Sequence, residues 1–345
     1  MRNIKLTIEY DGTGYHGWQS QINAAAVQDV VSSAVKKLTG EEIGLSGSSR
    51  TDTGVHALGQ VANFFTASKI PADKFAFAIN TMLPEDIVIR RSEEVHPEFH
   101  SRFSAKGKKY RYLIYNSAFP TALLRHRAWH VVYRLDPAAM EEGAGHFLGT
   151  HDFKAFMATG SSAKTTVRTI SSISVNVMSA ETGLIYKETG TVPVYNRKKE
   201  SYTGTVLASD LASKETDSAG RDMGSTDSEM AFTSGQTQKN HPPVFLDYTD
   251  REPTFTSDKI PENHLLVFQT DKTQENRPLV SQVALEIAGD GFLYNMVRII
   301  AGTLVQVGYG KIKPEDVPAI IEGGDRKKAG KTAPAHGLYL VEVYY

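Results

Sequence analysis

The sequence contains no cysteine. Disulfide bonds and thiolate-ligated metal sites are therefore excluded, and the composition fits a reducing compartment such as the cytoplasm. The sequence also lacks any run approaching the ~20 apolar residues that a membrane-spanning helix requires. Its first residues, MRNIKLTIEYDG, alternate between polar and apolar without the apolar stretch of a signal peptide. We therefore expect a soluble cytoplasmic protein that does not associate with membranes.

An excess of positive charge is missing as well, because the formal net charge is −1. That balance does not favour nucleic-acid binding, whose affinity usually depends on contacts to phosphates. It is uneven along the chain, however: residues 181–280 carry 11 Lys and Arg against 16 Asp and Glu, and the remainder carries 27 against 23. The basic clusters of that remainder suit an RNA backbone, although solvated loop lysines are an equal explanation for each alone. They are Arg90-Arg91; Arg102, Lys106, Lys108, Lys109 and Arg111; Arg125-His126-Arg127; and Arg326-Lys327-Lys328 with Lys331.

Hydrophobic periodicity predicts alternating strands and helices in both halves of the chain, and hence an α+β fold whose sheets are covered by helices. Strands are predicted near 4–10, 60–65, 87–90, 108–115, 167–177 and 281–287. Helices are predicted at 24–38 with Asn23 as its cap, from Pro71 to about 83, after Asp136-Pro137, and at 295–307.

Residues 180–280 form a polar tract, which is most polar at SDLASKETDSAGRDMGSTDSEM (209–230). Few apolar residues there could offset the entropy of ordering, so we expect partial disorder or short added strands at 184–186, 192–195 and 265–268. A tolerated surface loop without function is the alternative, since long insertions add little closure entropy. The expected organisation is an N-terminal domain (1–104), a C-terminal domain (105–179 with 281–345) and this insertion.

The segment GSSRTDTGVHA, from Gly47 to Ala57, places one carboxylate among hydroxyls and glycine. Side chains two residues apart share a face of an extended segment, so Arg50 and Asp52 could line the same cleft, with the cation keeping the carboxylate ionised. That pattern is typical of a catalytic acid. A surface loop salt bridge explains it equally well on these grounds alone.

The RTDTGVHA string resembles the active-site motif of the tRNA pseudouridine synthase A family. Further blocks of the sequence resemble the same family in the same order along the chain. They are YDGTGYHGWQ (10–19), FHSRFSAKGKKYRYLIY (99–115), GTHDFKAF (149–156), GFLYNMVRIIAG (291–302) and TAPAHGLYLVEVYY (332–345).

The resemblance implies two ferredoxin-like, RNA-binding-like domains with adjoining antiparallel sheets and a catalytic cleft between them. It also implies an isomerase that converts uridine to pseudouridine in the anticodon arm of tRNA, at positions 38 to 40, and that works as a homodimer. The reaction involves no redox change, so no metal, nucleotide or other cofactor is expected. A catalytically silent RNA-binding or chaperone module, and a synthase redirected to another RNA by the insertion, remain the rival interpretations.

The same resemblance assigns roles to individual residues. Asp52 matches the catalytic aspartate, which either adds to C1′ or removes the C2′ proton. Tyr110 matches the active-site tyrosine that stacks on the base and is a candidate proton acceptor, although a core aromatic would show the same strand pattern. Arg298 would pair with Asp52, and Arg50 would occupy the space left by the displaced nucleotide. The predicted substrate-binding residues are Tyr110, His56, Leu293, Arg102, Lys109 and Arg168.

Two other motifs have less support. Gly12, Gly14 and Gly17 form GxGxxG after a strand, but the predicted helix does not open on these glycines, as a dinucleotide site would require. The HxxxH pairs at 96–100 and 126–130 would suit zinc only on a helix. Pro97 disfavours a helix at the first pair and a strand follows the second, so structural or RNA-contacting histidines are the better interpretation.

Overall fold

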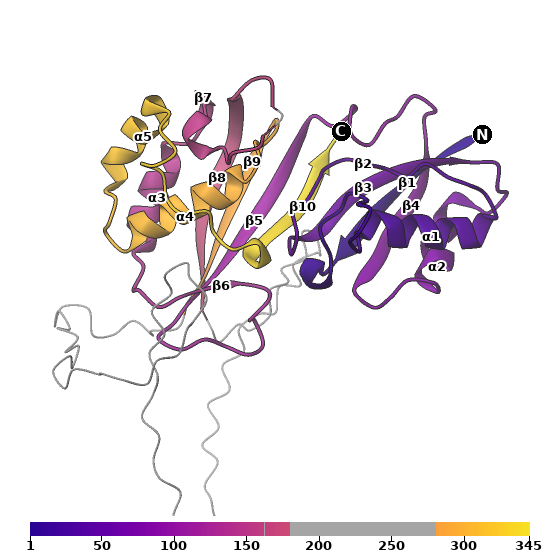
Figure 1. Ribbon diagram of the computed structural model, residues 1–345, viewed down its shortest axis with the longest axis horizontal. Coiled ribbons are helices and arrows are strands. Elements are labelled where there is room, and N and C mark those ends of the chain that lie inside the picture. Colours follow the sequence, from indigo (N-terminus) through magenta and orange to yellow (C-terminus); the bar gives the residue numbers. More distant parts are fainter. Residues whose placement is uncertain (162, 180–280) are drawn as a thin grey trace, which may run out of the picture. The chain divides into compact units, whose positions relative to one another are not determined.

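A ten-stranded, mostly antiparallel sheet runs through the residues that the structure describes, which are 1–161, 163–179 and 281–345 of a computed structural model (Figure 1). Its main path has the strand order β4-β1-β3-β10-β5-β9-β8-β7, with β2 paired to β3 and β6 to β5. The strands are β1 (Arg2–Tyr10), β2 (Ser46–Gly47), β3 (His56–Thr66), β4 (Ile87–Val95), β5 (Gly107–Asn116), β6 (Trp129–Val131), β7 (Gly149–Asp152), β8 (Val167–Ser179), β9 (Ser281–Gly289) and β10 (Leu338–Tyr344). The expected mixed α+β class is confirmed.

Five α-helices pack on this sheet in the described part of the chain. They are α1 (Val27–Thr39), α2 (Phe75–Asn80), α3 (Pro137–Gly145), α4 (Met296–Gly308) and α5 (Val317–Gly323). The first two accompany the strands of the first half, and the other three gather beside β7, β8 and β9 (Figure 1). Apolar residues that alternate along β1, such as Ile4, Leu6 and Ile8, are fully buried in the core between sheet and helices.

The helix boundaries in the first half differ from the sequence prediction. Asn23 does not cap α1, because the preceding residues are held extended: the His16 N–H donates to Ala25 O at 2.9 Å, and the N-cap residue is Ala26. The helix ends at Thr39, one residue beyond the predicted end, and its C-cap residue Gly40 has a left-handed φ of 72°. Pro71 opens only a 3-10 turn, and α2 ends at Asn80 because Pro84 disfavours helical geometry just before it.

Strand β10 joins the two halves of the sheet. It runs parallel to β3, with Tyr339 opposite His56, and antiparallel to β5, with Leu340 opposite Tyr110. The last strand of the chain therefore fixes the start of β3 beside the middle of β5. This connection brings the segment before His56 to the face of β5 that carries Tyr110.

Strands β8 and β9 flank the polar tract and pair directly with each other. Their antiparallel register brings Ser179 opposite Ser281. The strands suggested at 184–186, 192–195 and 265–268 lie outside the described residues. Over the ranges that the structure describes, no helix combines the length and apolar character needed to cross a bilayer.

Candidate active site

The loop that carries Asp52 connects β2 to β3 and is fixed at its start by one buried glutamine. The Gln60 Oε1 accepts a hydrogen bond from Ser48 Oγ at 2.7 Å, and its Nε2 donates to Ser49 O at 2.8 Å. Further along, Thr51 Oγ1 lies 2.7 Å from the buried hydroxyl of Tyr10. Because both contacts are buried, the loop enters the site in one defined conformation.

At two glycines of the GxGxxG string, the backbone packs so closely against this loop that there is no room for a side chain. A Cβ on Gly12 would lie 2.0 Å from Val55 O, and a Cβ on Gly17 would lie 2.1 Å from Thr51 O. Gly17 also has a φ of +86°, which disfavours any residue with a side chain. The third glycine, Gly14, has no neighbour within 4 Å of such a Cβ. The string thus permits close approach of backbone to the Asp52 loop, and α1 begins only at Val27, well beyond it.

Asp52 and Arg298 meet across the two halves of the sheet. Arg298 Nη1 lies 3.3 Å from Asp52 Oδ2, and the two side chains are 17% and 33% exposed. Burial raises the pKa of Asp52 above its ordinary value, and the nearby Arg298 guanidinium offsets this only in part. Partial burial therefore leaves a carboxylate that is more basic than one in water.

Arg298 is oriented by groups other than the carboxylate. Every residue of α4 except Arg298 and Gln306 is buried, so the guanidinium must find its partners at the helix surface. Its Nε donates to Ala333 O at 2.7 Å, and its Nη1 donates to Asn295 Oδ1 at 2.8 Å. Asn295 has a φ of 60°, the one positive φ of a non-glycine residue in the described ranges. Asparagine tolerates this conformation better than most residues, and strain of this kind is often found at functional sites.

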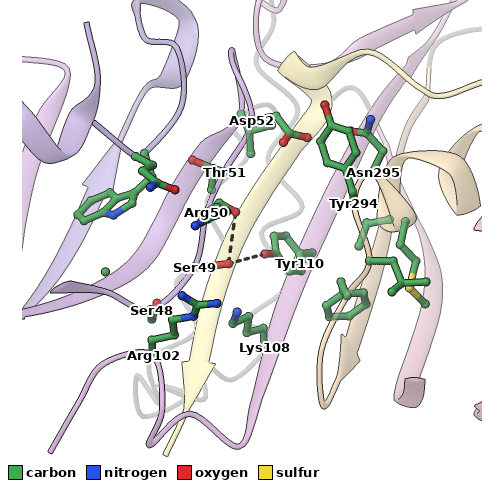
Figure 2. Close-up of a pocket in the computed structure, with 18 of the residues that line it drawn as sticks. Ser48, Ser49, Arg50, Thr51, Asp52, Arg102, Lys108, Tyr110, Tyr294 and Asn295 are labelled. Atoms are coloured by element: carbon green, nitrogen blue, oxygen red, sulfur yellow. Dashed lines mark hydrogen bonds between the residues drawn. The ribbon is translucent and has the colours of Figure 1, made fainter. Parts of the chain in front are cut away.

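A cavity of about 810 Å³ opens beside Asp52 and is lined from both halves of the sheet. Figure 2 shows Asp52 at one end, Arg102 and Lys108 at the other, and Ser49 and Tyr110 between them. Its size falls within the usual range for ligand sites. The mixture of aromatic, hydroxyl and cationic side chains suits a flat, anionic ligand.

Tyr110 is buried in the wall of this cavity. Its hydroxyl lies 3.1 Å from Ser49 Oγ, and its ring packs edge-on against Phe292 with centroids 5.1 Å apart. Burial raises the pKa of Tyr110 to about 12, to which the Asp52 charge contributes, while the Ser49 contact acts in the opposite sense. The phenol is therefore protonated at neutral pH.

The structure brings six of the predicted site residues to this cavity. Arg50 lines it with an exposed side chain, and in the part of the chain described here its guanidinium forms no ion pair. Leu293 is 5% exposed and forms part of the wall near the start of α4. The complete set is Arg50, Asp52, Arg102, Tyr110, Leu293 and Arg298.

His56, predicted to bind substrate, lies behind the loop and does not line the cavity. Its ring is 3% exposed, and its Nε2 lies 2.9 Å from His126 O and 3.2 Å from His336 O. The Nδ1 accepts from the Gly12 N–H at 3.0 Å and lies 3.1 Å from Asp11 Oδ1. These contacts tie three backbone segments to the first residue of β3.

Lys109 and Arg168 also lie away from the cavity. Lys109 points to the opposite face of β5 from Tyr110 and pairs with Glu286 at 2.7 Å. Arg168 Nη1 donates to the backbone carbonyls of Thr165 and Val167. Lys109 lies away from the cavity because neighbouring residues on a strand face opposite ways, and Tyr110 is the next residue of β5.

Sequence reasoning did not single out several residues of the cavity. Lys108 was noted only as part of a basic cluster, although its alternation with Tyr110 indicates a shared face. Ser49 and Asn295 lie within the quoted motifs, and Asn295 is of a type that tolerates positive φ. Among the described residues, no group of three or more His, Cys, Asp or Glu side chains is arranged to hold a metal ion.

Comparison with known proteins identifies similar chains over the whole length. The sequence model of a family described as tRNA pseudouridine synthase matches residues 6–104 and 144–345. A protein of Acetivibrio thermocellus named tRNA pseudouridine synthase A is 47% identical over 345 residues, which covers all of both chains. A protein of the same name from Ruminiclostridium cellulolyticum is 44% identical, and tRNA pseudouridine synthase A 2 of Clostridium perfringens is 37% identical, again over the full length of both chains.

Proposed function

This chain belongs to the tRNA pseudouridine synthase family, and from that membership we propose that it isomerises uridine to pseudouridine in the anticodon stem-loop of tRNA, at positions 38 to 40. The observation that carries the assignment to this site is the contact between Asp52 and Arg298 at the end of a cavity wide enough for a nucleotide. A partly buried carboxylate held by one guanidinium is the single ionised group that the chemistry needs.

The reaction breaks the bond between ribose C1′ and uracil N1, rotates the base, joins it through C5 and removes the C5 proton. Asp52 begins it, either by adding at C1′ or by removing the C2′ proton. The raised pKa of Asp52 makes this carboxylate a better nucleophile and base than an exposed aspartate. Arg298, held by Asn295 Oδ1 and Ala333 O, keeps it ionised and oriented.

Tyr110 and Leu293 hold the base between them in this proposal. The buried ring offers a stacking surface, and the hydroxyl is the candidate acceptor of the C5 proton. Because the pKa of Tyr110 is about 12, the protonated hydroxyl is a weak acceptor, and its hydrogen-bond contact with Ser49 Oγ at 3.1 Å fixes its orientation toward the base. Arg50, which forms no ion pair in the described residues, is free to fill the space left in the tRNA stem by the displaced nucleotide.

We further propose the finer architecture of the family for this chain. Two ferredoxin-like domains, 1–104 and 105–179 with 281–345, would each supply one wall of the cavity, and 180–280 would be an insertion into the second. The strand order β4-β1-β3 on one side of β10 and β5-β9-β8 on the other supports this division. The active form would be a cytoplasmic homodimer that binds tRNA across both subunits.

The decisive experiment maps pseudouridines in unmodified tRNA that has been treated with the purified protein without added metal or nucleotide. We expect new pseudouridines in the anticodon arm with the wild type, and none with Asp52→Asn. The matched control Asp29→Asn, which changes an exposed carboxylate in the first turn of α1, should retain activity. Binding without modification by the wild type would favour a silent RNA-binding module, and activity of Asp52→Asn would remove Asp52 from the mechanism.

A further inference from the structure

Two cations meet at the end of the cavity that is furthest from Asp52. Arg102, from the turn before β5, and Lys108, near the start of β5, point toward each other in Figure 2 and both line the cavity. Like charges this close repel each other, which costs free energy unless an anion balances them. The question is therefore which group balances the positive charge of Arg102 and Lys108.

No carboxylate in the described part of the chain provides that balance. The ion pairs of the neighbouring basic residues are formed elsewhere, since Lys109 and Arg111 both pair with Glu286 on the opposite face of β5. Arg102 and Lys108 form no ion pair with any described residue. The contrast between Lys108 and its strand neighbour Lys109 indicates that the charge of Lys108, like that of Arg102, is directed into the cavity rather than at a carboxylate.

Arg102 is positioned without being neutralised. Its guanidinium lies over the ring of Phe103, 5.7 Å from the centroid, and its backbone N–H donates to His100 Nδ1 at 3.1 Å. The Phe103 ring in turn packs on the His100 ring with centroids 4.4 Å apart. An aromatic support of this kind restricts the side chain while leaving the charge and the N–H groups available.

The lowered pKa of Lys108 is a second indication that the cavity binds an anion at this end. Burial removes part of the water around the Lys108 ammonium and Arg102 adds repulsion, so the pKa of Lys108 falls to about 8. A bound anion would raise this pKa again, because its negative charge stabilises the protonated ammonium. The other titratable or charged side chains that line the cavity are Arg50, Asp52, His100, Tyr110, Tyr294 and Arg298; of these, Asp52 lies at the far end and is paired with Arg298.

We propose that Arg102 and Lys108 together bind one backbone phosphate adjacent to the uridine that occupies the cavity, and so set which nucleotide of the strand reaches Asp52. A phosphate matches the pair because it accepts from the planar fork of an arginine and from the point charge of a lysine at once. Lys108 and Tyr110 are two residues apart on β5, about 7 Å along the strand. A phosphate bound there therefore lies within reach of a base stacked on Tyr110.

This inference rests on the proposed function, and its first test uses the proton linkage of Lys108. The dissociation constant for tRNA is measured from pH 7 to pH 9 with the wild type and with Lys108→Arg, whose side chain stays charged throughout. The wild type should lose up to about tenfold in affinity over this interval, because phosphate binding then requires protonation of a neutral amine. The arginine variant should show no such loss, and a wild-type profile that matches it would overturn the proposal.

The second test counts phosphate contacts. Lys108→Met should reduce the slope of log K against log salt by about 0.7 to 0.9, the value for one lost contact. The matched control is Lys106→Met, which removes an exposed lysine just before β5 that does not line the cavity. Equal slopes for Lys108→Met and the wild type would contradict the proposal, as would an equal effect of both substitutions.

The third test locates the phosphate. Anticodon-arm hairpins are prepared with a neutral methylphosphonate at the linkage on the 5′ or the 3′ side of the target uridine. One of the two should weaken binding by the wild type while leaving Lys108→Met unaffected by the replacement. If both enzymes respond equally to both hairpins, the pair does not bind these phosphates. Because the wild type must first form pseudouridine in the unmodified hairpin, a failure of the proposed function would be recognised separately.

Discussion

At the scale of single residues, the environment of Asp52 reflects two opposed effects on its charge. Burial raises the pKa of the carboxyl, and Arg298 at 3.3 Å lowers it, with burial prevailing. A single contact with the guanidinium is a weaker compensation than the several hydrogen bonds that water would supply. Burial thus makes the carboxylate more basic and lowers folded-state stability where it is ionised.

This balance predicts how Asp52→Asn changes stability. Because the folded-state pKa exceeds the unfolded value, the native protein binds more protons between the two values, and the free energy of unfolding falls as pH rises through that interval. The amide cannot ionise and escapes this loss. We expect the melting temperature of the variant, relative to the wild type, to increase from pH 4 to pH 7. If calorimetry shows that the melting temperature of the wild type rises relative to that of the variant from pH 4 to pH 7, folding lowers the pKa of Asp52 instead of raising it.

The hydroxyl of Tyr110 can be tested apart from its ring. Tyr110→Phe keeps the aromatic surface and removes the group that lies 3.1 Å from Ser49 Oγ. If that hydroxyl transfers the C5 proton, product formation should fall by at least ~100-fold while tRNA binding changes little. Ser49→Ala is the companion variant, since it leaves the phenol in place and isolates the effect of its partner. Normal turnover by Tyr110→Phe would restrict this residue to stacking.

At the scale of secondary-structure elements, the contact between Gly17 and the Asp52 loop can be tested by adding one methyl group. Gly17→Ala would bring a Cβ within 2.1 Å of Thr51 O at a φ of +86°, so backbone atoms must move. We expect a loss of about 1 to 3 kcal/mol in unfolding free energy and a lower kcat.

Gly14→Ala provides the control for that experiment within the same segment. Its Cβ would meet no atom within 4 Å, so its stability should remain within about 0.5 kcal/mol of the wild type. Denaturant unfolding of the two variants, together with pseudouridine assays, gives both quantities. Equal effects of the two substitutions would show that the close approach to the loop is unimportant.

The elements also show what local sequence determines and what it does not. The alternation along β1 and the Asp136 cap of α3, whose Oδ1 accepts from the Ala138 and Ala139 N–H groups, follow from local patterns and were predicted correctly. Asn23 has the right chemistry for a cap, but the hydrogen bond from the His16 N–H to Ala25 O holds its neighbours extended. Such competition comes from a loop that folds back on the chain, and the cap residue type alone does not report it.

In the candidate site, too, some residues could be predicted from local motifs and others could not. Motifs indicated Asp52, Tyr110 and Arg298, and the structure places all three around one cavity. His56 stands in the same motif as Asp52, yet it lies behind the loop because it begins a strand that pairs with β10. The insertion of the last strand between β3 and β5 is a long-range event, so the side of the loop on which each residue lies could not be read from the motif.

At the scale of the whole molecule, the pairing of Ser179 with Ser281 predicts that the intervening segment is dispensable for the fold. Replacing residues 181–280 with a short Gly-Ser link needs only a hairpin between adjacent strands, and it shifts the formal net charge from −1 to +4. We expect a folded enzyme that still modifies anticodon-arm uridines in a mapping assay. A trimmed protein that folds and dimerises but leaves tRNA unmodified would show that the segment takes part in substrate recognition.

The same strand pairing suggests that the enzyme can be split into two fragments that reassemble through their strands. If the backbone is cut between residues 179 and 281, the second fragment still contributes β9, which lies between β5 and β8 of the first, and β10, which lies between β3 and β5. The first fragment then holds Asp52 and Tyr110, and the second holds Arg298. Neither piece contains all three residues of the proposed site, so pseudouridine formation by a mixture of the two would measure their reassembly. The protein is in this sense a natural starting point for a split-enzyme reporter.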